Sequence, residues 1–155
     1  MILDCCRGLI LCWCVGFRYV VCNLVTNKWW LLSNNNCSFS SAHLGFDPIV
    51  SSHFHVIEYG KKRADESVGV SIYSSKSVAW MFKESKWSEG VVRTYLTSVF
   101  LNGFMHWLEF SQIVVVDMQG KTWRKICRPH GEAISIHEAQ VVNNRFVLLV
   151  LGCHE

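Results

Sequence analysis

The stretch IVVVDMQGKTW, residues 113–123, contains four apolar residues, an acid, a glycine-containing turn and a tryptophan. A similar stretch, YVVCNLVTNKW, occupies residues 19–29. Two copies of one pattern in a chain of 155 residues indicate a repeated structural unit. Each copy is expected to form a buried strand, a tight polar turn and the start of the next strand.

Both copies extend further along the chain. RGLILCW (7–13) precedes the first copy and NGFMHWL (102–108) precedes the second. A looser copy lies between them, as HFHVIEY (53–59) followed by VGVSIYSSKSVAWMF (68–82), and a fourth begins at NNRFVLLVL (143–151). Equivalent positions in these copies are structural repeat positions, namely Gly8, Asn23, Trp29, Tyr73, Trp80, Gly103, Asp117 and Trp123.

The pattern predicts an all-β fold. Val114, Val115 and Val116 are consecutive, so both faces of their strand must be buried, and sheets stacked on sheets satisfy this. A unit of about 40–50 residues with four strands is typical of a β-propeller blade. We therefore predict one partial propeller domain over 1–155, with blades near 2–45, 46–98 and 99–142, another starting at 143–155, and truncation at both ends. A β-sandwich is the alternative.

Specific side chains are expected to fix the hairpins. Trp29 and Trp123 should begin a strand and pack back across the hairpin. Asp117 and its counterpart Asn23 should accept hydrogen bonds from backbone amides at the turn, and Asp47 before Pro48 should do the same.

Composition excludes several classes of protein. Half of the residues are hydrophobic and 17% are charged, which excludes a disordered chain. A net charge of +3 is too small to favour a nucleic-acid partner, and the basic run 61–63 is followed at once by Asp65 and Glu66. The apolar run 9–17 is too short to span a bilayer, so no membrane partner is expected. The eight cysteines include no Cys-x-x-Cys pair, and Cys12, Cys14 and Cys22 resemble core residues of a reduced cytoplasmic or nuclear protein.

Few side chains suggest chemistry. His53 and His55 would share one face of a strand and could bind a metal, but Glu58 would fall on the opposite face and no third ligand is evident. Cys127 with His130 could form a nucleophilic pair, yet no nucleophile motif or glycine-rich oxyanion turn accompanies them. We therefore predict no catalytic, metal or cofactor site.

The ordered motifs carry a family resemblance. ILDCCRGLILC (2–12), YVVCNLVTNKW (19–29), LGFDPIVSSHFHVIEY (44–59), VSIYSSKSVAW (70–80), VFLNGFMHWL (99–108) and IVVVDMQGKTWRKICRPHG (113–131) follow the order seen in plant F-box proteins. The chain resembles the F-box-associated, kelch-like propeller region of the large family found in grasses.

The resemblance implies a function. Such proteins are substrate receptors of SCF-type ubiquitin ligases, in which an F-box binds a Skp-type adaptor and the associated region holds a target protein. Met1 lies inside the first propeller motif, so adaptor binding would need an upstream F-box. The alternatives are a truncated fragment without independent activity and a metal-dependent kelch-like enzyme at His53 and His55. Target contacts are expected on loops, at 33–43, 60–67, 84–95 and 128–138.

Overall fold

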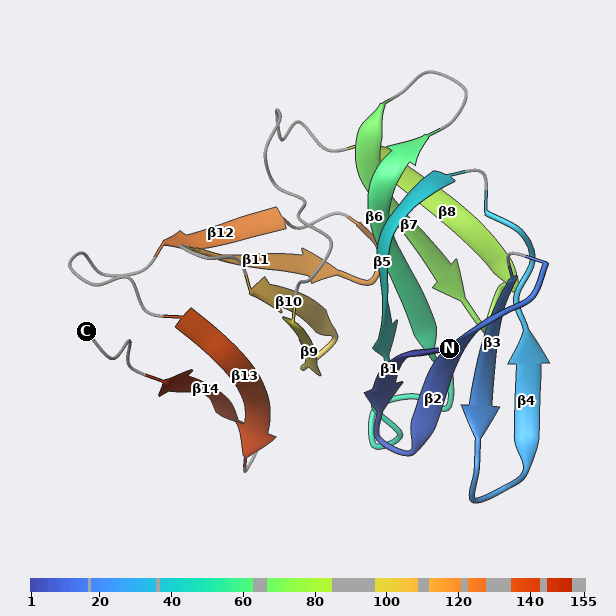
Figure 1. The fold of residues 1–155 in the computed structure, drawn as a ribbon, viewed down its shortest axis with the longest axis horizontal. Coiled ribbons are helices and arrows are strands. Elements are labelled where there is room, and N and C mark those ends of the chain that lie inside the picture. The colour runs from blue at the N-terminus through green and yellow to red at the C-terminus, as the bar shows by residue number, and fades with distance from the viewer. Residues whose placement is uncertain are drawn as a thin grey trace. The chain divides into compact units, whose positions relative to one another are not determined.

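All regular elements that the structure describes are β-strands. The computed structural model describes residues 1–16, 18–35, 37–62, 67–84, 97–108, 112–120, 123–127, 135–142 and 145–151. The strands are β1 (Ile2–Cys6), β2 (Leu9–Cys14), β3 (Arg18–Asn23), β4 (Lys28–Leu31), β5 (Cys37–Gly45), β6 (His55–Lys62), β7 (Val68–Ser74), β8 (Ala79–Glu84), β9 (Thr97–Leu101), β10 (Phe104–Leu108), β11 (Gln112–Asp117), β12 (Trp123–Cys127), β13 (Ser135–Val142) and β14 (Arg145–Leu151) (Figure 1). The part of the chain that the structure describes contains no helix that could span a membrane.

The strands form antiparallel sheets in which each strand pairs with its neighbour in sequence. The first three sheets have four strands each, β1–β4, β5–β8 and β9–β12, and β13 pairs with β14. Repeated four-stranded antiparallel sheets confirm the predicted fold, a partial β-propeller.

The sheets begin at different residues from those expected. The first sheet spans 2–31 and the second 37–84, whereas the sequence placed the first boundary near residue 45. Strand β5, Cys37–Gly45, causes the difference, because it pairs with β6 and opens the second sheet. Its Ser-rich sequence, CSFSSAHLG, has the composition of a loop, and most of the loop expected at 33–43 is therefore strand.

The chain divides into two compact units, 1–94 and 95–155. In the first unit, the sheets β1–β4 and β5–β8 share one apolar core. It contains Leu9, Leu11, Tyr19 and Val21 from the first sheet and Ala42, Leu44, Val56 and Tyr73 from the second, with Leu32 and Phe54 beside them. In the second unit, strand β13 contacts β9, and Met105, Trp107, Val114 and Val116 are buried.

Two hairpins have the same two-residue turn. Cys6 pairs with Leu9 around Arg7 and Gly8, and Leu101 pairs with Phe104 around Asn102 and Gly103. All four turn residues have positive φ, with values of 45° and 85° in the first turn and 52° and 81° in the second. This is the geometry of a type I′ turn, which matches the twist of the paired strands and favours glycine at its second position.

The longer hairpins each have one polar side chain at the end of a strand. Asn23 Oδ1 accepts hydrogen bonds from the N–H groups of Val25 and Thr26, both at 3.0 Å. Asp117 Oδ1 accepts one from the Gln119 N–H at 2.9 Å, and Ser74 Oγ accepts one from the Lys76 N–H at 3.3 Å. Asparagine, serine and aspartate thus have the same role in three sheets. Each side-chain oxygen accepts a hydrogen bond from a backbone N–H of the turn that has no partner in the neighbouring strand.

Candidate functional site

A buried carboxylate lies between the first two sheets. Glu58, on β6, is 2% exposed and faces Ser71 on the neighbouring strand β7. The Tyr19 hydroxyl, from β3 of the other sheet, donates a hydrogen bond to Glu58 Oε1. The Asn35 side-chain amide, from the segment between the sheets, donates one to Oε2. Ser71 Oγ donates to Asn35 Oδ1 at 3.3 Å, which joins four residues in one network.

The protonation of this network follows from burial. Burial raises the pKa of Glu58, while the hydrogen bonds from Tyr19 and Asn35 oppose that rise. Burial and the nearby Glu58 carboxylate raise the pKa of the Tyr19 hydroxyl, which therefore remains a donor. A carboxylate with both oxygens bonded and almost no exposure is well suited to joining sheets and poorly suited to meeting a substrate.

The sequence around Glu58 contains a signal for this network. Residues 56–59 are all buried, so the strand has no solvent-facing side there on which a carboxylate could lie. A glutamate inside such a strand must be paired, because leaving it alone in an apolar interior costs several kcal/mol. The identity of its partners comes from the fold, since Tyr19 is 39 residues away.

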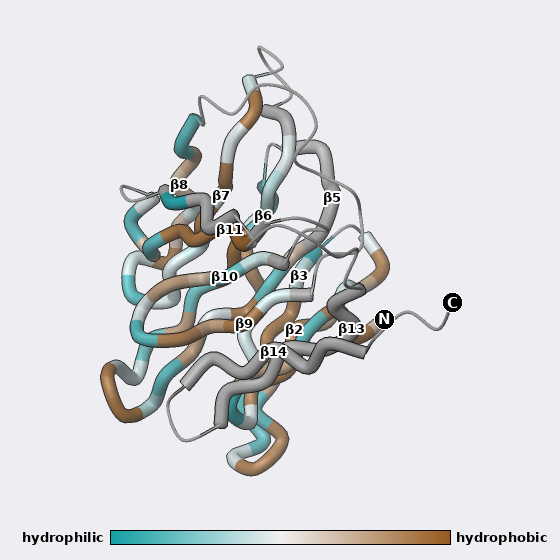
Figure 2. The backbone as a smooth tube through the Cα atoms, turned by 90° about the vertical axis from the view of Figure 1, so that its left-hand side faces the viewer, coloured by the Kyte–Doolittle hydropathy of each residue, from teal (hydrophilic) through white to brown (hydrophobic). Residues whose placement is uncertain are grey.

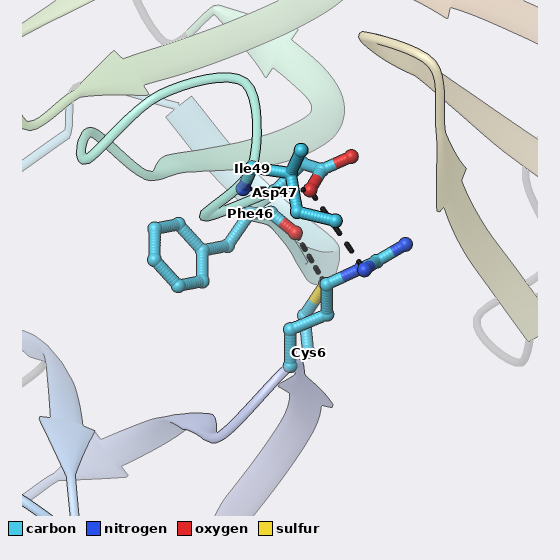
Figure 3. A network of polar contacts seen from close by, with 5 residues as sticks. Cys6, Phe46, Asp47 and Ile49 are labelled. Atoms are coloured by element: carbon cyan, nitrogen blue, oxygen red, sulfur yellow. Dashed lines mark hydrogen bonds and ion pairs between the residues drawn. The ribbon is translucent and has the colours of Figure 1, made fainter.

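Side chains of β1 bond to the backbone of β5 and of the residue that follows it. Asp4 Oδ2 accepts the Leu44 N–H at 2.7 Å, and Cys6 Sγ donates to the Phe46 carbonyl at 3.3 Å. Figure 3 shows Cys6 directed at Phe46, with Asp47 and Ile49 in the loop beyond. Arg7 Nη1 lies 3.8 Å from Asp47 Oδ1, so the β1–β2 turn contacts the β5–β6 loop.

Two side chains in this region, Cys6 and His43, are uncharged near neutral pH. Burial raises the pKa of the Cys6 thiol to about 11, which keeps it protonated and a poor nucleophile at neutral pH. Burial lowers the pKa of His43 to about 4. His43 is therefore neutral near pH 7, and its 3.9 Å approach to Asp4 is then a contact between a neutral ring and a carboxyl group.

The histidines singled out in the sequence do not form a metal site within the described part of the chain. His55 lies on β6 and His53 precedes it, and burial together with the neighbouring His53 lowers the pKa of His55. No group of three metal-ligating side chains occurs among the described residues. Cys127 and His130 lie outside the described side chains, so the structure gives no geometry for that pair.

The tryptophans of the first two sheets differ in how they pack. Trp29 is 75% exposed and does not pack across its hairpin, because β4 is an edge strand and Trp29 lies on its uncovered face. Its neighbour Trp30 contacts Phe54, with ring centroids 5.3 Å apart. In the second sheet Trp80 pairs directly with Tyr73, with centroids 5.4 Å apart, and donates to the Ser33 carbonyl at 2.7 Å. Trp123 begins β12, and its side chain lies outside the described residues.

The cysteines of the first sheet also differ from the expected core positions. Leu9 and Leu11 face the core, so Cys12 and Cys14 lie on the other face of β2, where Cys14 is exposed. Cys22 is on the same side and its pKa is raised, by burial first and then by the nearby Cys12.

The polar turn expected at Asp47 is present. Asp47 Oδ1 accepts the Ile49 N–H at 3.2 Å, and the Asp47 carbonyl accepts the N–H groups of Val50 and Ser51. Most of the expected binding loops at 60–67, 84–95 and 128–138 lie outside the described residues.

Repeated four-stranded antiparallel sheets, two of which share an apolar core, place the chain in the class of β-propeller-type proteins. The family described as F-box associated beta propeller domain matches residues 2–142, and the chain belongs to this family. A comparison with curated proteins found no match.

Proposed function

We propose that the chain is a non-enzymatic protein-interaction module that holds a target protein for an SCF-type ubiquitin ligase. The observation that carries this proposal is the family match over 2–142 on a fold of repeated four-stranded antiparallel sheets. An F-box, where one precedes this region, would bind a Skp-type adaptor. The propeller would bind the target protein.

The use of polar groups in the first unit supports a scaffold role. Glu58, Asp4 and the Cys6 thiol are each bonded to another strand or linking segment. Rigid sheets of this kind leave the connecting turns to present residues that vary with the partner.

The proposal can be tested by joining the chain to an F-box and expressing it in plant cells. The fusion should co-purify with a Skp-type adaptor and enrich ubiquitylated proteins. The matched control is the same F-box joined to an unrelated β-domain, which should bind the adaptor without enriching those proteins. Equal enrichment by the two fusions would contradict target binding by this chain.

A preliminary measurement establishes that the purified chain folds alone. Cooperative thermal unfolding of a monomer would show an independent module. A non-cooperative signal would favour the alternative of a fragment without independent activity.

A further inference from the structure

Besides the β2–β3 turn with Val15, three turns or loops of the first unit expose large aliphatic side chains. These residues, hereafter the turn surface, are Leu24, Val25, Ile49, Val50 and Val78. Their exposed fractions lie between 67% and 89%. Such positions more commonly hold Gly, Asn, Asp, Ser or Pro.

Strand order places these residues at one end of the first unit. In each sheet the first-to-second and third-to-fourth connections lie at the same end, because the strands are antiparallel. The Arg7–Asp47 pair joins the β1–β2 turn to the β5–β6 loop. Phe54 and Ser75 join that loop to the β7–β8 turn, through Phe54 N–H to Ser75 Oγ at 2.9 Å and Ser75 N–H to the Phe54 carbonyl at 3.0 Å. Figure 2 shows hydrophobic colouring on loops at its lower end, where Figure 1 places the β1–β2, β3–β4 and β5–β6 connections.

Folding of the first unit does not account for these side chains. The turns are held by the polar groups Asn23, Asp47 and Ser74, which bond to backbone amides whatever the neighbouring side chains are. Because these side chains stay exposed in the folded chain, little of their apolar surface is removed from water. They therefore contribute little to the stability of the fold.

The third sheet shows that the repeat does not require aliphatic residues at its turns. Asn102 and Gln119 are exposed there, and Met118, the apolar residue of its turn, is 8% exposed and packs inward. The exposed aliphatic side chains are therefore a property of the first unit and not of the hairpin geometry.

Basic side chains outnumber acidic ones beside the turn surface. Lys28 at the start of β4 and Lys76 in the β7–β8 turn are both exposed. The four connections 7–8, 24–27, 46–54 and 75–78 are fully described, and their one carboxylate, Asp47, lies 3.8 Å from Arg7. These connections contain no second carboxylate that could pair with Lys28 or Lys76. The two exposed lysines therefore favour a partner of opposite charge.

We propose that the turn surface binds an acidic segment of a partner protein that carries spaced large apolar side chains. The apolar side chains would cover the exposed aliphatic residues, and the acidic groups would pair with Lys28 and Lys76. Apolar patches edged by charge are typical of protein–protein contact sites. This inference rests on the proposed function and deepens it, since it specifies the chemistry of the target protein. It requires that the chain binds a target and does not require a role in a ligase.

Fluorescence polarisation with designed peptides tests the inference on the purified chain. The probes are three labelled peptides, one alternating Glu with Leu and Phe, one with Lys replacing every Glu, and one with Ser replacing every Leu and Phe. The first should bind most tightly, and its affinity should fall as salt is added, because the charge pairs are exposed. The Lys28→Glu and Lys76→Glu double variant should reverse the preference between the acidic and basic peptides.

Matched variants locate the binding. Replacing Val25, Ile49 and Val50 by serine should weaken binding of the acidic peptide by about tenfold or more, which corresponds to about 1.4 kcal/mol. The control is Val15→Ser, because Val15 is 105% exposed in the β2–β3 turn at the opposite end of the first sheet. This control should bind as the unchanged chain does.

Several results would overturn the inference. They are absence of binding to the acidic peptide, equal binding of the basic peptide, an equal loss on Val15→Ser, or an unchanged affinity in the triple variant. Self-association that the triple variant abolishes would assign the surface to a second copy of the chain. Peptide binding without enrichment of ubiquitylated proteins by the F-box fusion would contradict the ligase role alone.

Discussion

The interior between the first two sheets and the turns at one end of their strands have opposite chemistry. The interior contains a carboxylate, a phenol, an amide and a hydroxyl in one network, from Glu58, Tyr19, Asn35 and Ser71. The turns expose the aliphatic side chains of the turn surface. Each region thus contains residues of the kind that usually occupies the other.

The difference between the two regions separates stability from binding. Buried polar groups are tolerated because each bonds to another, and removing one leaves its partner unsatisfied. Exposed aliphatic residues have no such partner to lose when the chain is folded alone. Changes in the interior should therefore lower stability, and changes at the turns should affect binding.

The largest expected effect is that of Gly69→Ala in the interior of β7. A Cβ at this position would lie 2.1 Å from the Lys83 carbonyl oxygen and 2.9 Å from the Glu84 Cα, which are backbone atoms of β8. The two strands would have to separate, so we expect a loss of about 4 kcal/mol or more in the free energy of unfolding. Urea denaturation followed by tryptophan fluorescence measures it.

Gly8→Ala is the control for this variant. No atom lies within 4 Å of a Cβ at Gly8, but its φ is +85°, so the expected loss is only the backbone cost of about 1–2 kcal/mol. Equal losses in the two variants would contradict the close approach of β7 and β8.

The pH dependence of stability should reveal the buried His43. Its pKa falls from 6.5 in an exposed ring to about 4 in the fold, because burial disfavours the charged form. The unfolded chain therefore takes up a proton at higher pH than the folded chain does, and stability is lost as pH falls from 6.5 towards 4. The shift corresponds to about 3 kcal/mol, with the full contribution present above pH 6.5.

His43→Gln isolates this contribution in urea denaturation at about pH 7 and about pH 4. The variant should lose less stability between the two values than the unchanged chain. Burial raises the pKa of the neighbouring Asp4, whose contribution has the opposite sign and is lost as pH rises through its folded pKa. Asp4 is present in both proteins, so identical slopes would contradict the assignment to His43.

Removing the Tyr19 hydroxyl should cost about 2 kcal/mol. In Tyr19→Phe, Glu58 Oε1 loses a donor in an interior that water does not reach, and the penalty is that of an unsatisfied buried acceptor. Tyr73→Phe is the matched control, because Tyr73 lies in the same apolar cluster and outside the network. Equal melting temperatures for the two variants would show that the network adds no stability.

The smallest expected effect is a gain. Val78 has a φ of +54° and is β-branched, a combination that is strained, whereas Asn27 has a φ of +53° at the same place in the first sheet's hairpin. Val78→Asn should raise stability by about 1 kcal/mol, as read from the melting temperature. The same variant should weaken acidic-peptide binding, so stability and affinity would change in opposite directions.

The sequence predicted the repeated architecture better than its boundaries. Consecutive apolar residues such as Val114–Val116 indicated strands buried on both faces, and the hairpins followed from Asn23 and Asp117. Strand β5 was mistaken for a loop, because its serines satisfy the composition of a loop and its pairing with β6 is a tertiary property. Trp29 was expected to pack across its hairpin but is exposed, because sequence spacing gives the position of a residue in a hairpin but not which face of the sheet is covered.

The candidate sites could be predicted only in part. Glu58 sits in a strand that is apolar on both faces, which requires partners, but Tyr19 and Asn35 become neighbours only when the sheets stack. The turn surface depends on strand order, since Val25, Ile49 and Val78 are far apart in sequence and antiparallel pairing places their connections at one end of the unit.

The most direct test compares two variants in two measurements. One replaces Val25, Ile49 and Val50 by serine, and the other is Tyr19→Phe; each is assayed for melting temperature and for acidic-peptide affinity below its melting temperature. We expect the triple variant to keep its melting temperature and lose affinity, and Tyr19→Phe to melt earlier and keep its affinity. A triple variant that melts earlier with unchanged affinity would contradict the division between a structural interior and a binding surface at the turns.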